Sequence, residues 1–424
     1  MSAARDSERS VMKQTQCNEP LVIVGAGIAA VYAAESARKA GFDGRIVICG
    51  DEPEFPYDRP PLSKKVLQDA GESARISLRD NAFYDAHNID LRLGNAAQRI
   101  DRHARTVTFA DGATLAYGTL VLATGSSLRT LPLLTPTMKG VFYLRQISDA
   151  IALRDTLARA RKLAVVGAGV IGLEVASVAN GMGIDVTVLE AGSRPMARAT
   201  CAEVCEFVVG EHTRRGVDIR TGITIQDVTD RPQGYRLALS DGSYLEADAV
   251  VVGIGVVPNI PLATAAGLDV CEAGICVDGQ GRTSDEHIYA AGEVAFHYNA
   301  RAGRAQRQEN WHHAVAHGEH VGRAVVCGSS DYDEISGYWS DQYDFSLQSF
   351  GNPIGERNVV RGDPATGSFA VFHVQDDVVA GVSSVNAPRE MRVGKALVRA
   401  AERVPVAVLR DTTVDLAKWP SSTQ

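Results

Sequence analysis

The sequence predicts an α/β protein, and three observations support that fold class. At two places, around residues 22–30 and 164–172, an apolar run leads into a glycine-rich turn and a helical segment. In both places the helical segment is followed by a second strand-like apolar run, at 45–51 and at 185–190. After about residue 330 the pattern changes to short aromatic and β-branched runs. We therefore expect two Rossmann-like dinucleotide-binding domains and a C-terminal α+β domain.

The first glycine-rich turn follows the apolar run 22–24 and has the spacing of a dinucleotide-binding fingerprint. In that pattern the first glycine makes the tight turn, the second admits a pyrophosphate, and a small residue lets the helix pack on its strand. The helix start offers N–H groups and a positive dipole end to the phosphates. The residues concerned are Gly25, Gly27, Ala29 and Ala30.

The second turn repeats this arrangement with Gly167, Gly169, Val170, Ile171 and Gly172. The strand after each helix ends near an acid, Asp51 in the first case and Glu190 in the second. Both lie close to the offset of about 20 residues expected for the acid that binds the ribose hydroxyls. Glu190 would repel a 2′-phosphate and favours NADH over NADPH, although Arg194 and Arg198 behind it weaken that preference.

Two such fingerprints in one chain predict two bound dinucleotides, most simply a flavin and a nicotinamide that exchange a hydride. The two copies share more than the turns. Residues 117–125 and 247–255 are similar buried strands that end in glycine, and each follows a hairpin-like pair. A helical stretch is expected from about Pro388 to Ala401 in the last domain.

Composition is that of an ordinary globular enzyme. The chain has 424 residues, of which 45% are hydrophobic and 22% charged, and its net charge is −8. The charge gives no indication of nucleic acid or an anionic membrane as partner. No stretch reaches the roughly 20 apolar residues of a membrane span. Residues 1–20 lack an apolar signal core, so we expect a loose polar extension and a cytoplasmic protein.

The seven cysteines form no Cys-x-x-Cys pair. Only Cys49 lies between residues 18 and 200, where a disulfide or peroxide reductase of this architecture would place its redox cysteine. Cys271 and Cys276 are separated by four residues. We interpret them as core or surface thiols rather than as a redox disulfide.

Four histidines follow Trp311, and two pairs of them have helical metal-ligand spacing. No cysteine or carboxylate completes a site, so we expect surface or packing histidines and no metal. The histidines are His312, His313, His317 and His320.

With these motifs in place, the chain from about Pro20 onwards resembles the FAD-dependent NADH:ferredoxin reductases of bacterial oxygenase systems. The resemblance rests on both fingerprints and on five further segments. These are 56–64 (PYDRPPLSK), the Ala-Thr-Gly end of strand 117–125, 253–259 (GIGVVPN), 288–295 (IYAAGEVA) and 339–343 (WSDQY).

The resemblance implies a glutathione-reductase-like architecture in which the NAD-binding domain interrupts the FAD-binding domain. We expect a polar extension at 1–19, an FAD-binding domain at 20–125 and 249–329, an NAD-binding domain at 126–248, and a C-terminal α+β domain at 330–424.

It also implies site residues. Lys64 would lie beside the flavin ring, Glu174 would hold it there, and Trp311 would shield the flavin face. By itself, Lys64 fits a solvated lysine after a proline turn equally well, and Trp311 an ordinary core residue. The implied FAD contacts are Gly25, Gly27, Ala29, Ala30, Asp51, Arg59, Lys64, Ala97, Ala123, Thr124, Gly125, Arg145, Gly292, Glu293 and Trp311. The implied NAD contacts are Gly167, Gly169, Val170, Ile171, Gly172, Glu174, Glu190, Arg198, Gly253, Ile254 and Gly255.

One position departs from the family pattern. Glu293 stands where the family has Asp, so its carboxylate reaches one methylene further toward the ribityl hydroxyls.

The implied activity is hydride transfer from NADH to tightly bound FAD, followed by single-electron reduction of a [2Fe–2S] ferredoxin that serves a Rieske-type oxygenase or a cytochrome P450. Arg301, Arg304 and Arg307 form a candidate basic patch for an acidic ferredoxin. Two alternatives remain: reduction of another acceptor (rubredoxin, a quinone or a disulfide), and a redox interaction protein like the apoptosis-inducing flavoproteins.

Overall fold

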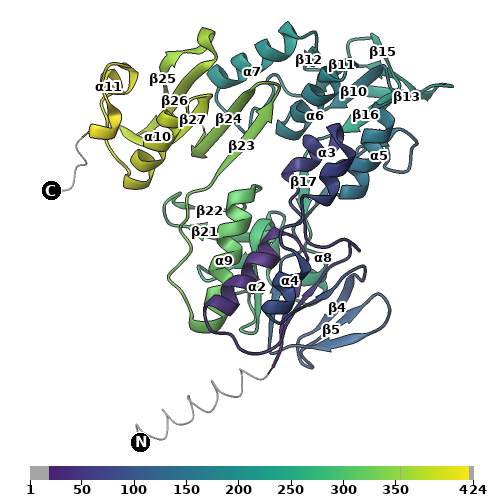
Figure 1. Cartoon of the computed structure of the whole chain (residues 1–424), viewed down its shortest axis with the longest axis vertical. Helices are drawn as coiled ribbons and strands as arrows, with labels where there is room; N and C mark the ends of the chain where they lie inside the picture. The colour runs from purple at the N-terminus through teal and green to yellow at the C-terminus, as the bar shows by residue number, and fades with distance from the viewer. Residues whose placement is uncertain (1–18, 354, 420–424) are drawn as a thin grey trace, which may run out of the picture. The chain divides into compact units, whose positions relative to one another are not determined.

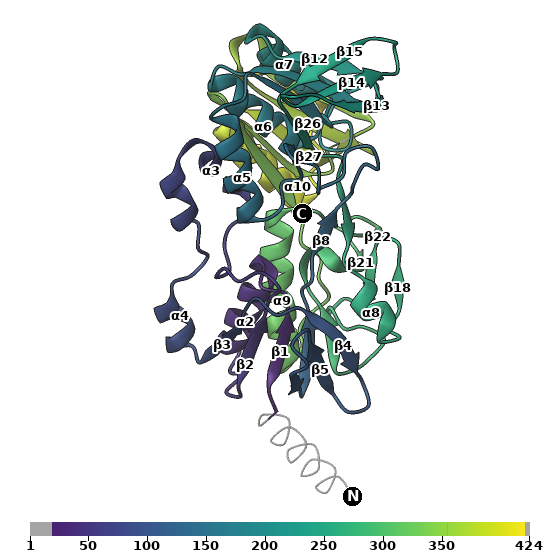
Figure 2. The ribbon, with the colours of Figure 1, turned by 90° about the vertical axis from the view of Figure 1, so that its right-hand side faces the viewer.

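The computed structural model describes residues 19–353 and 355–419, which form two compact units (Figures 1 and 2). Unit 1 contains the described residues up to Asp58 together with Ile76–Ser127 and Val256–Ser336. Unit 2 contains Arg59–Arg75, Leu128–Gly255 and the described residues from Gly337. Residues 1–18 of the predicted extension lie outside the described residues.

Unit 1 is built on a parallel five-stranded sheet with the strand order β20-β7-β1-β2-β3. Its strands are β1 (Leu21–Val24), β2 (Ile46–Cys49), β3 (Ile89–Arg92), β7 (Thr119–Leu122) and β20 (Ile288–Ala290). The helices of this unit are α2 (Ile28–Lys39), α4 (Asn81–Ala86), α8 (Pro261–Ala265) and α9 (Trp311–Cys327). A sheet of this kind carries ligands at the carboxyl ends of its strands, where the glycine turn lies.

The strands of this sheet are buried on both faces, which explains their continuous apolar runs. Leu21 and Ile23 pack into one core cluster with α2, α4 and α9. Val22 and Val24 point to the opposite face and pack against the two smaller sheets of the unit. These sheets contain β4 (Ala97–Asp101), β5 (Thr106–Phe109) and β6 (Thr114–Ala116), and β18 (Val270–Cys271), β19 (Gly274–Val277), β21 (Ala295–Asn299) and β22 (Arg304–Gln306).

Helices α2 and α9 run side by side at very close range (Figures 1 and 2). A Cβ atom at Gly318 would lie 2.5 Å from the carbonyl oxygen of Ala29, and one at Gly322 would lie 2.1 Å from that of Ala33. Only glycine permits this approach. The contact fixes the middle of α9 beside the first two turns of α2, which is the helix that follows the first fingerprint.

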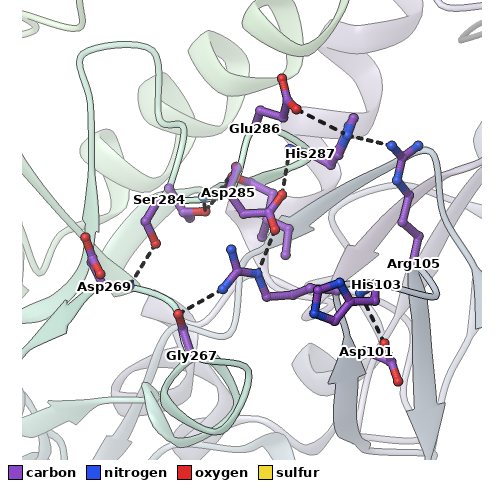
Figure 3. A network of polar contacts seen from close by, with 12 residues as sticks. Asp101, His103, Arg105, Gly267, Asp269, Ser284, Asp285, Glu286 and His287 are labelled. Carbon is purple, nitrogen blue, oxygen red and sulfur yellow. Dashed lines mark hydrogen bonds and ion pairs between the residues drawn. The ribbon is translucent and has the colours of Figure 1, made fainter.

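A polar network joins the two later segments of unit 1 (Figure 3). The Arg102 guanidinium donates to the Asp285 carboxylate at 2.7 Å and to the Gly267 carbonyl at 3.0 Å. Arg105 contacts the His287 ring at 2.7 Å. These contacts join the hairpin of β4 and β5 to the segment Val256–Ser336. Side-chain contacts therefore hold the separate segments of unit 1 together, in addition to the pairing of its strands.

Unit 2 contains a second parallel sheet, with the order β12-β11-β10-β16-β9. Its strands are β9 (Val141–Phe142), β10 (Lys162–Val166), β11 (Asp185–Glu190), β12 (Asp218–Thr221) and β16 (Ala249–Val252). Helices α5 (Ile147–Leu157), α6 (Val170–Gly181) and α7 (Ala202–Arg214), and a sheet of β13 (Ile225–Asp230), β14 (Tyr235–Leu239) and β15 (Tyr244–Ala247), accompany it.

The pairing of β16 corrects one expected boundary. Ala249–Val252 was placed in the returning FAD-binding segment, but its residues pair with Leu163–Val166 of β10. Hydrogen bonding along a central strand binds this segment to the second sheet, so the chain returns to unit 1 after Gly255. The repeat of 117–125 in 247–255 already indicated this, because β7 pairs with β1 in the same manner.

The C-terminal part of unit 2 is an antiparallel sheet with the order β23-β24-β27-β26-β25. Its strands are β23 (Gly337–Gln342), β24 (Phe345–Gly351), β25 (Arg357–Asp363), β26 (Ser368–Gln375) and β27 (Val378–Val385). Helix α10 (Pro388–Ala400) packs on it and confirms the predicted helix, and α11 (Val406–Arg410) follows. The short helix α3 (Lys65–Gln68) packs against α5 in the same unit.

The predicted fold class, two nucleotide-binding units of α/β type with a C-terminal α+β part, is confirmed. Within the described ranges, 19–353 and 355–419, no helix combines the length and the apolar character needed to cross a membrane.

Three of the histidines of α9, His313, His317 and His320, are buried in unit 1, whereas His312 is exposed. His313 and His317 are buried and stack at 5.0 Å between ring centroids, and His297 of β21 stacks on both of them. Burial lowers the pKa of His297 to about 4 and that of His313 to about 3. These rings therefore stay neutral in the folded protein.

This stack predicts acid sensitivity. Below the ordinary histidine pKa of about 6.5, these histidines bind protons in the unfolded chain but stay neutral in the folded chain. The free energy of unfolding therefore decreases as the pH falls from about 6.5 toward 4. We expect the melting temperature to drop steeply over that range when it is measured with saturating FAD. His297→Phe should flatten the slope, whereas substitution of the exposed His103 by Gln should leave it unchanged. If the melting temperature of His297→Phe depended on pH as steeply as that of the unsubstituted protein, the histidine stack would not be the cause of the acid sensitivity.

Candidate functional site

The first fingerprint forms a turn that only glycine can make. Gly25 has φ +112°, and a Cβ atom there would lie 2.1 Å from the carbonyl oxygen of Ala123. The amide of Ala123 in turn donates to the carbonyl of Val24, so the end of β7 lies directly against the turn. Gly25 therefore has a structural role, and it sets the direction in which α2 begins.

Gly27 has the opposite surroundings. A Cβ atom there would meet no heavy atom within 4 Å, and no side chain caps the start of α2, whose first turn holds no acid. The first N–H groups of a helix have no partner within it. Open space beside uncapped donors at the positive end of the helix dipole fits a pyrophosphate.

The second fingerprint in unit 2 reproduces both features. Gly167 has φ +102° and its Cβ position lies 2.4 Å from the Gly253 carbonyl oxygen. The Cβ position of Gly172 lies 2.1 Å from the Gly167 carbonyl, which holds α6 tightly against the turn. Around Gly169 the space is open and the start of α6 is uncapped. Ile171, in the first turn of α6, is 47% exposed.

Each expected ribose acid lies beside its own turn. The Glu190 carboxylate accepts hydrogen bonds from the amides of Ala168, at 2.8 Å, and Gly192, at 2.7 Å. Its position at the end of β11 is therefore fixed against the second turn. Asp51 follows β2, is exposed, and accepts from the Glu52 amide at 3.1 Å.

Glu174 is the centre of the polar contacts in unit 2. It lies on α6 and is 2% exposed. One oxygen accepts from Ser63 Oγ at 2.5 Å and forms an ion pair with Lys64 Nζ at 2.8 Å. The other accepts from Ser340 Oγ on β23 at 2.6 Å. The predicted pairing of Lys64 with Glu174 is present, and the ammonium is held at a defined place.

The two serines were missed as functional residues in the sequence. Ser63 and Ser340 both stand in the motifs that carry the family resemblance, yet nothing in the local pattern shows that their hydroxyls meet one carboxylate. They lie 111 and 166 residues from Glu174. Only the folded chain brings them together.

Two other predicted FAD contacts also meet in unit 2. Arg59 Nη1 donates to the carbonyl of Arg145 at 2.5 Å. The amide of Arg145 donates to Asp149 at the start of α5. Arg59, Lys64 and Arg145 thus belong to unit 2, whereas the other predicted FAD contacts belong to unit 1.

Trp311 begins α9 in unit 1, and its indole N–H donates to the Asp58 carboxylate at 2.7 Å. Further along the same helix, His317 Nδ1 accepts from the amide of Gly292 at 3.0 Å. Gly292 has φ +75° and precedes Glu293, which is partly buried. Asp58 and His317 were not predicted as site residues; both position groups that were.

The remaining predicted residues lie in strands, turns and helix starts of the two units. Thr124 Oγ1 donates to the Asn259 carbonyl at 2.9 Å, and Asn259 Nδ2 donates back to the Thr124 carbonyl at 2.8 Å. Ala97 begins β4. The Arg198 guanidinium lies 3.3 Å from the Cβ position of Gly255, after β16 in unit 2. Ala29, Ala30, Gly125, Val170 and Ile254 complete the predicted set.

The cysteine and metal expectations can be compared with the structure. Cys49 is buried, and burial raises the pKa of its thiol to about 12, which is unsuitable for a redox nucleophile. The described part of the chain contains no group of three or more histidine, cysteine, aspartate or glutamate side chains that could hold a metal ion. The predicted histidine pairs pack on one another instead.

The expected basic patch is largely neutralised. Arg301 pairs with Asp333 at 2.9 Å, and Arg307 pairs with Glu309. Arg304 is exposed on β22. The hypothesis took all three arginines as available cations, but Arg301 pairs with a residue 32 positions away and Arg307 pairs with one two positions away.

Two family models match the chain. Residues 19–318 match the pyridine nucleotide-disulphide oxidoreductase family, and residues 338–419 match the reductase C-terminal family. The anthranilate 1,2-dioxygenase system ferredoxin–NAD(+) reductase component of Burkholderia cepacia is 43% identical over 404 residues, which cover 94% of this chain and 98% of that protein.

Two solved structures are similar over nearly the whole chain. The ferredoxin reductase for the CYP199A2 system from Rhodopseudomonas palustris has a TM-score of 0.92 and 34% identity, covering 95% of this chain and 99% of that one. The covalent putidaredoxin reductase–putidaredoxin complex has a TM-score of 0.90 and 36% identity, covering 95% and 98%.

The open space at Gly169 gives a direct test of the second fingerprint. Gly169→Ala should fold normally, because its Cβ meets no protein atom, but the methyl group would occupy the pyrophosphate space. We expect the KM for NADH to rise at least about tenfold, equivalent to about 1.4 kcal/mol, with FAD content unchanged. Gly181→Ala, at the other end of α6 and also in open space, is the matched control. Equal KM values for the two variants would exclude this cradle.

The Glu174 cluster predicts a large loss of stability on truncation. Glu174→Ala leaves the Lys64 ammonium and two hydroxyls without their acceptor, and we expect a loss of about 3 kcal/mol in urea unfolding. Lys64→Met should cost less, and the double variant should show coupling of the two sites. The exposed Glu246→Ala serves as control. Additive effects of the two single substitutions would show that the ion pair contributes nothing.

Proposed function

We propose, because the chain belongs to the pyridine nucleotide-disulphide oxidoreductase family, that it is an FAD-dependent NADH:ferredoxin oxidoreductase. The observation that carries this is the pair of glycine cradles, by which we mean the open space around Gly27 and around Gly169. Each lies at the start of a helix whose first N–H groups have no side-chain cap. Relatives named as ferredoxin–NAD(+) reductase components of dioxygenase systems match over more than nine-tenths of the chain.

The chain provides one set of candidate binding residues for FAD and another for NADH. In unit 1, the start of α2 and Asp51 would bind the pyrophosphate and a ribose of FAD, and Glu293 the ribityl chain. In unit 2, the start of α6 and Glu190 would bind NADH, whose unphosphorylated ribose avoids repulsion by the carboxylate. FAD, when bound, supplies the exchange between a hydride and single electrons.

Lys64 is our candidate for a residue that tunes the flavin. A fixed cation stabilises an anionic reduced flavin, and it does so best when it needs no reorganisation. The bonds from Glu174 to Ser63 and Lys64 supply that rigidity within unit 2. Lys64→Met should lower the flavin reduction potential; an unchanged potential would make Lys64 structural only.

The acceptor is an iron–sulfur protein rather than a disulfide. Cys49 is the one cysteine between residues 18 and 200, and its thiol is buried with a raised pKa, which does not suit a redox nucleophile. We therefore propose a [2Fe–2S] ferredoxin as partner and, through it, an oxygenase of the Rieske or P450 type. NADH is available in the cytoplasm, which we propose as the compartment.

Anaerobic spectroscopy tests this function. NADH should bleach the flavin of the holoprotein and then an added [2Fe–2S] ferredoxin, with sustained turnover, and NADPH should do so more slowly because of Glu190. Rubredoxin and a small disulfide are the comparison acceptors. Flavin bleaching without ferredoxin reduction, combined with consumption of the disulfide, would contradict the proposal. A stable reduced complex with no acceptor turnover would favour a redox interaction protein.

A further inference from the structure

Two cysteines that looked unrelated in the sequence are neighbours in unit 1. Cys271 ends β18 and Cys276 lies in β19, and the two strands form an antiparallel hairpin. Cys271 is opposite Gly274, and residues two apart on a strand share a face, so Cys271 and Cys276 are diagonal neighbours on the same face. Cys271 is one of the groups that raise the pKa of Cys276, so the two side chains lie within electrostatic range of each other.

This pair differs from the other described cysteines. Cys49, Cys201 and Cys205 are buried, and Cys327 is exposed at the end of α9. Cys271 and Cys276 are both partly exposed, so a small oxidant in solution can reach them. Among the described residues, only this pair places two partly exposed thiols on the same face of one hairpin.

We propose that Cys271 and Cys276 form an oxidisable dithiol that closes to a disulfide across the hairpin of β18 and β19. Diagonal neighbours on an antiparallel pair lie near the range of Cα separations that a disulfide spans, and the hairpin is an edge of its sheet, where a small adjustment is possible. The short turn at 272–273 keeps both sulfurs in place.

The chemistry balances with a hydroperoxide as oxidant. One thiolate attacks the peroxide oxygen, the O–O bond breaks, and a sulfenic acid and hydroxide form. The second sulfur then attacks the sulfenic sulfur, forming the S–S bond and releasing water. In sum, two thiols and one hydrogen peroxide give one disulfide and two waters. Burial and the neighbouring Cys271 raise the pKa of Cys276, so the closure should be faster at higher pH.

The hairpin lies next to a segment that the proposed function uses. Strand β19 pairs in parallel with β21, which follows directly after Gly292–Val294. A Cβ atom at Gly274 would lie 2.4 Å from the Val294 carbonyl oxygen, so the turn of the hairpin rests on that segment. Closing the dithiol would restrain the edge of this sheet next to Gly292–Val294.

Mass spectrometry of the holoprotein tests the proposal. After treatment with hydrogen peroxide, the peptide containing both residues should lose two hydrogen atoms and regain them on reduction. Cys271→Ser and Cys276→Ser should each abolish this shift, whereas Cys327→Ser should retain it. Melting curves confirm that the variants are folded. Amide exchange across 270–277 should slow in the oxidised protein.

Two results would overturn the proposal. One is that the peptide keeps its mass under conditions that oxidise Cys327. The other is that both cysteines take up oxygen atoms independently, without forming the bridge. Neither result would bear on ferredoxin reduction, so this test is separate from that of the proposed function.

Discussion

Both units depend on one constraint, the close approach of a glycine turn to the end of the neighbouring parallel strand. At Gly25 a Cβ atom would lie 2.1 Å from the Ala123 carbonyl oxygen, and at Gly167 one would lie 2.4 Å from that of Gly253. Because the turn is pressed against this strand end, the helix behind it starts at a fixed place with its N–H groups uncapped. The space at the next glycine of each turn is open, and the uncapped N–H groups beside it fit a pyrophosphate.

A single buried carboxylate organises much of unit 2. Glu174 joins the segment that carries Ser63 and Lys64, helix α6 beside the second fingerprint, and strand β23 of the C-terminal sheet. A buried charge costs free energy unless it is paired and fully hydrogen-bonded, and here both oxygens have partners. This explains physically why Arg59–Arg75 belongs to the same unit as the second sheet, although it lies inside the first domain in sequence.

The chain also carries polar groups that the proposed function does not use directly. The neutral histidine stack supports the amide of Gly292 through His317, so the position of this amide depends on rings that must stay uncharged. Strand β19, which carries Cys276, pairs with β21, and β21 directly follows the Gly292–Val294 segment. Acid and oxidants are therefore expected to act on unit 1 through different residues.

The sequence by itself determined the two turns, their acids, helix α10 and the repeat, because each is specified by residues a few positions apart. Short-range sterics dictate that Gly25 adopts a positive φ, and apolar runs such as Leu21–Val24 specify strands buried on both faces. Only the tertiary structure decided which partners meet. Strand pairing placed Ala249–Val252 in the second sheet, Asp333 neutralised Arg301, Ser340 reached Glu174, and hairpin register joined two thiols. Such contacts link residues that are distant in sequence or that meet through strand register. The local sequence pattern specifies neither long-range contacts nor register.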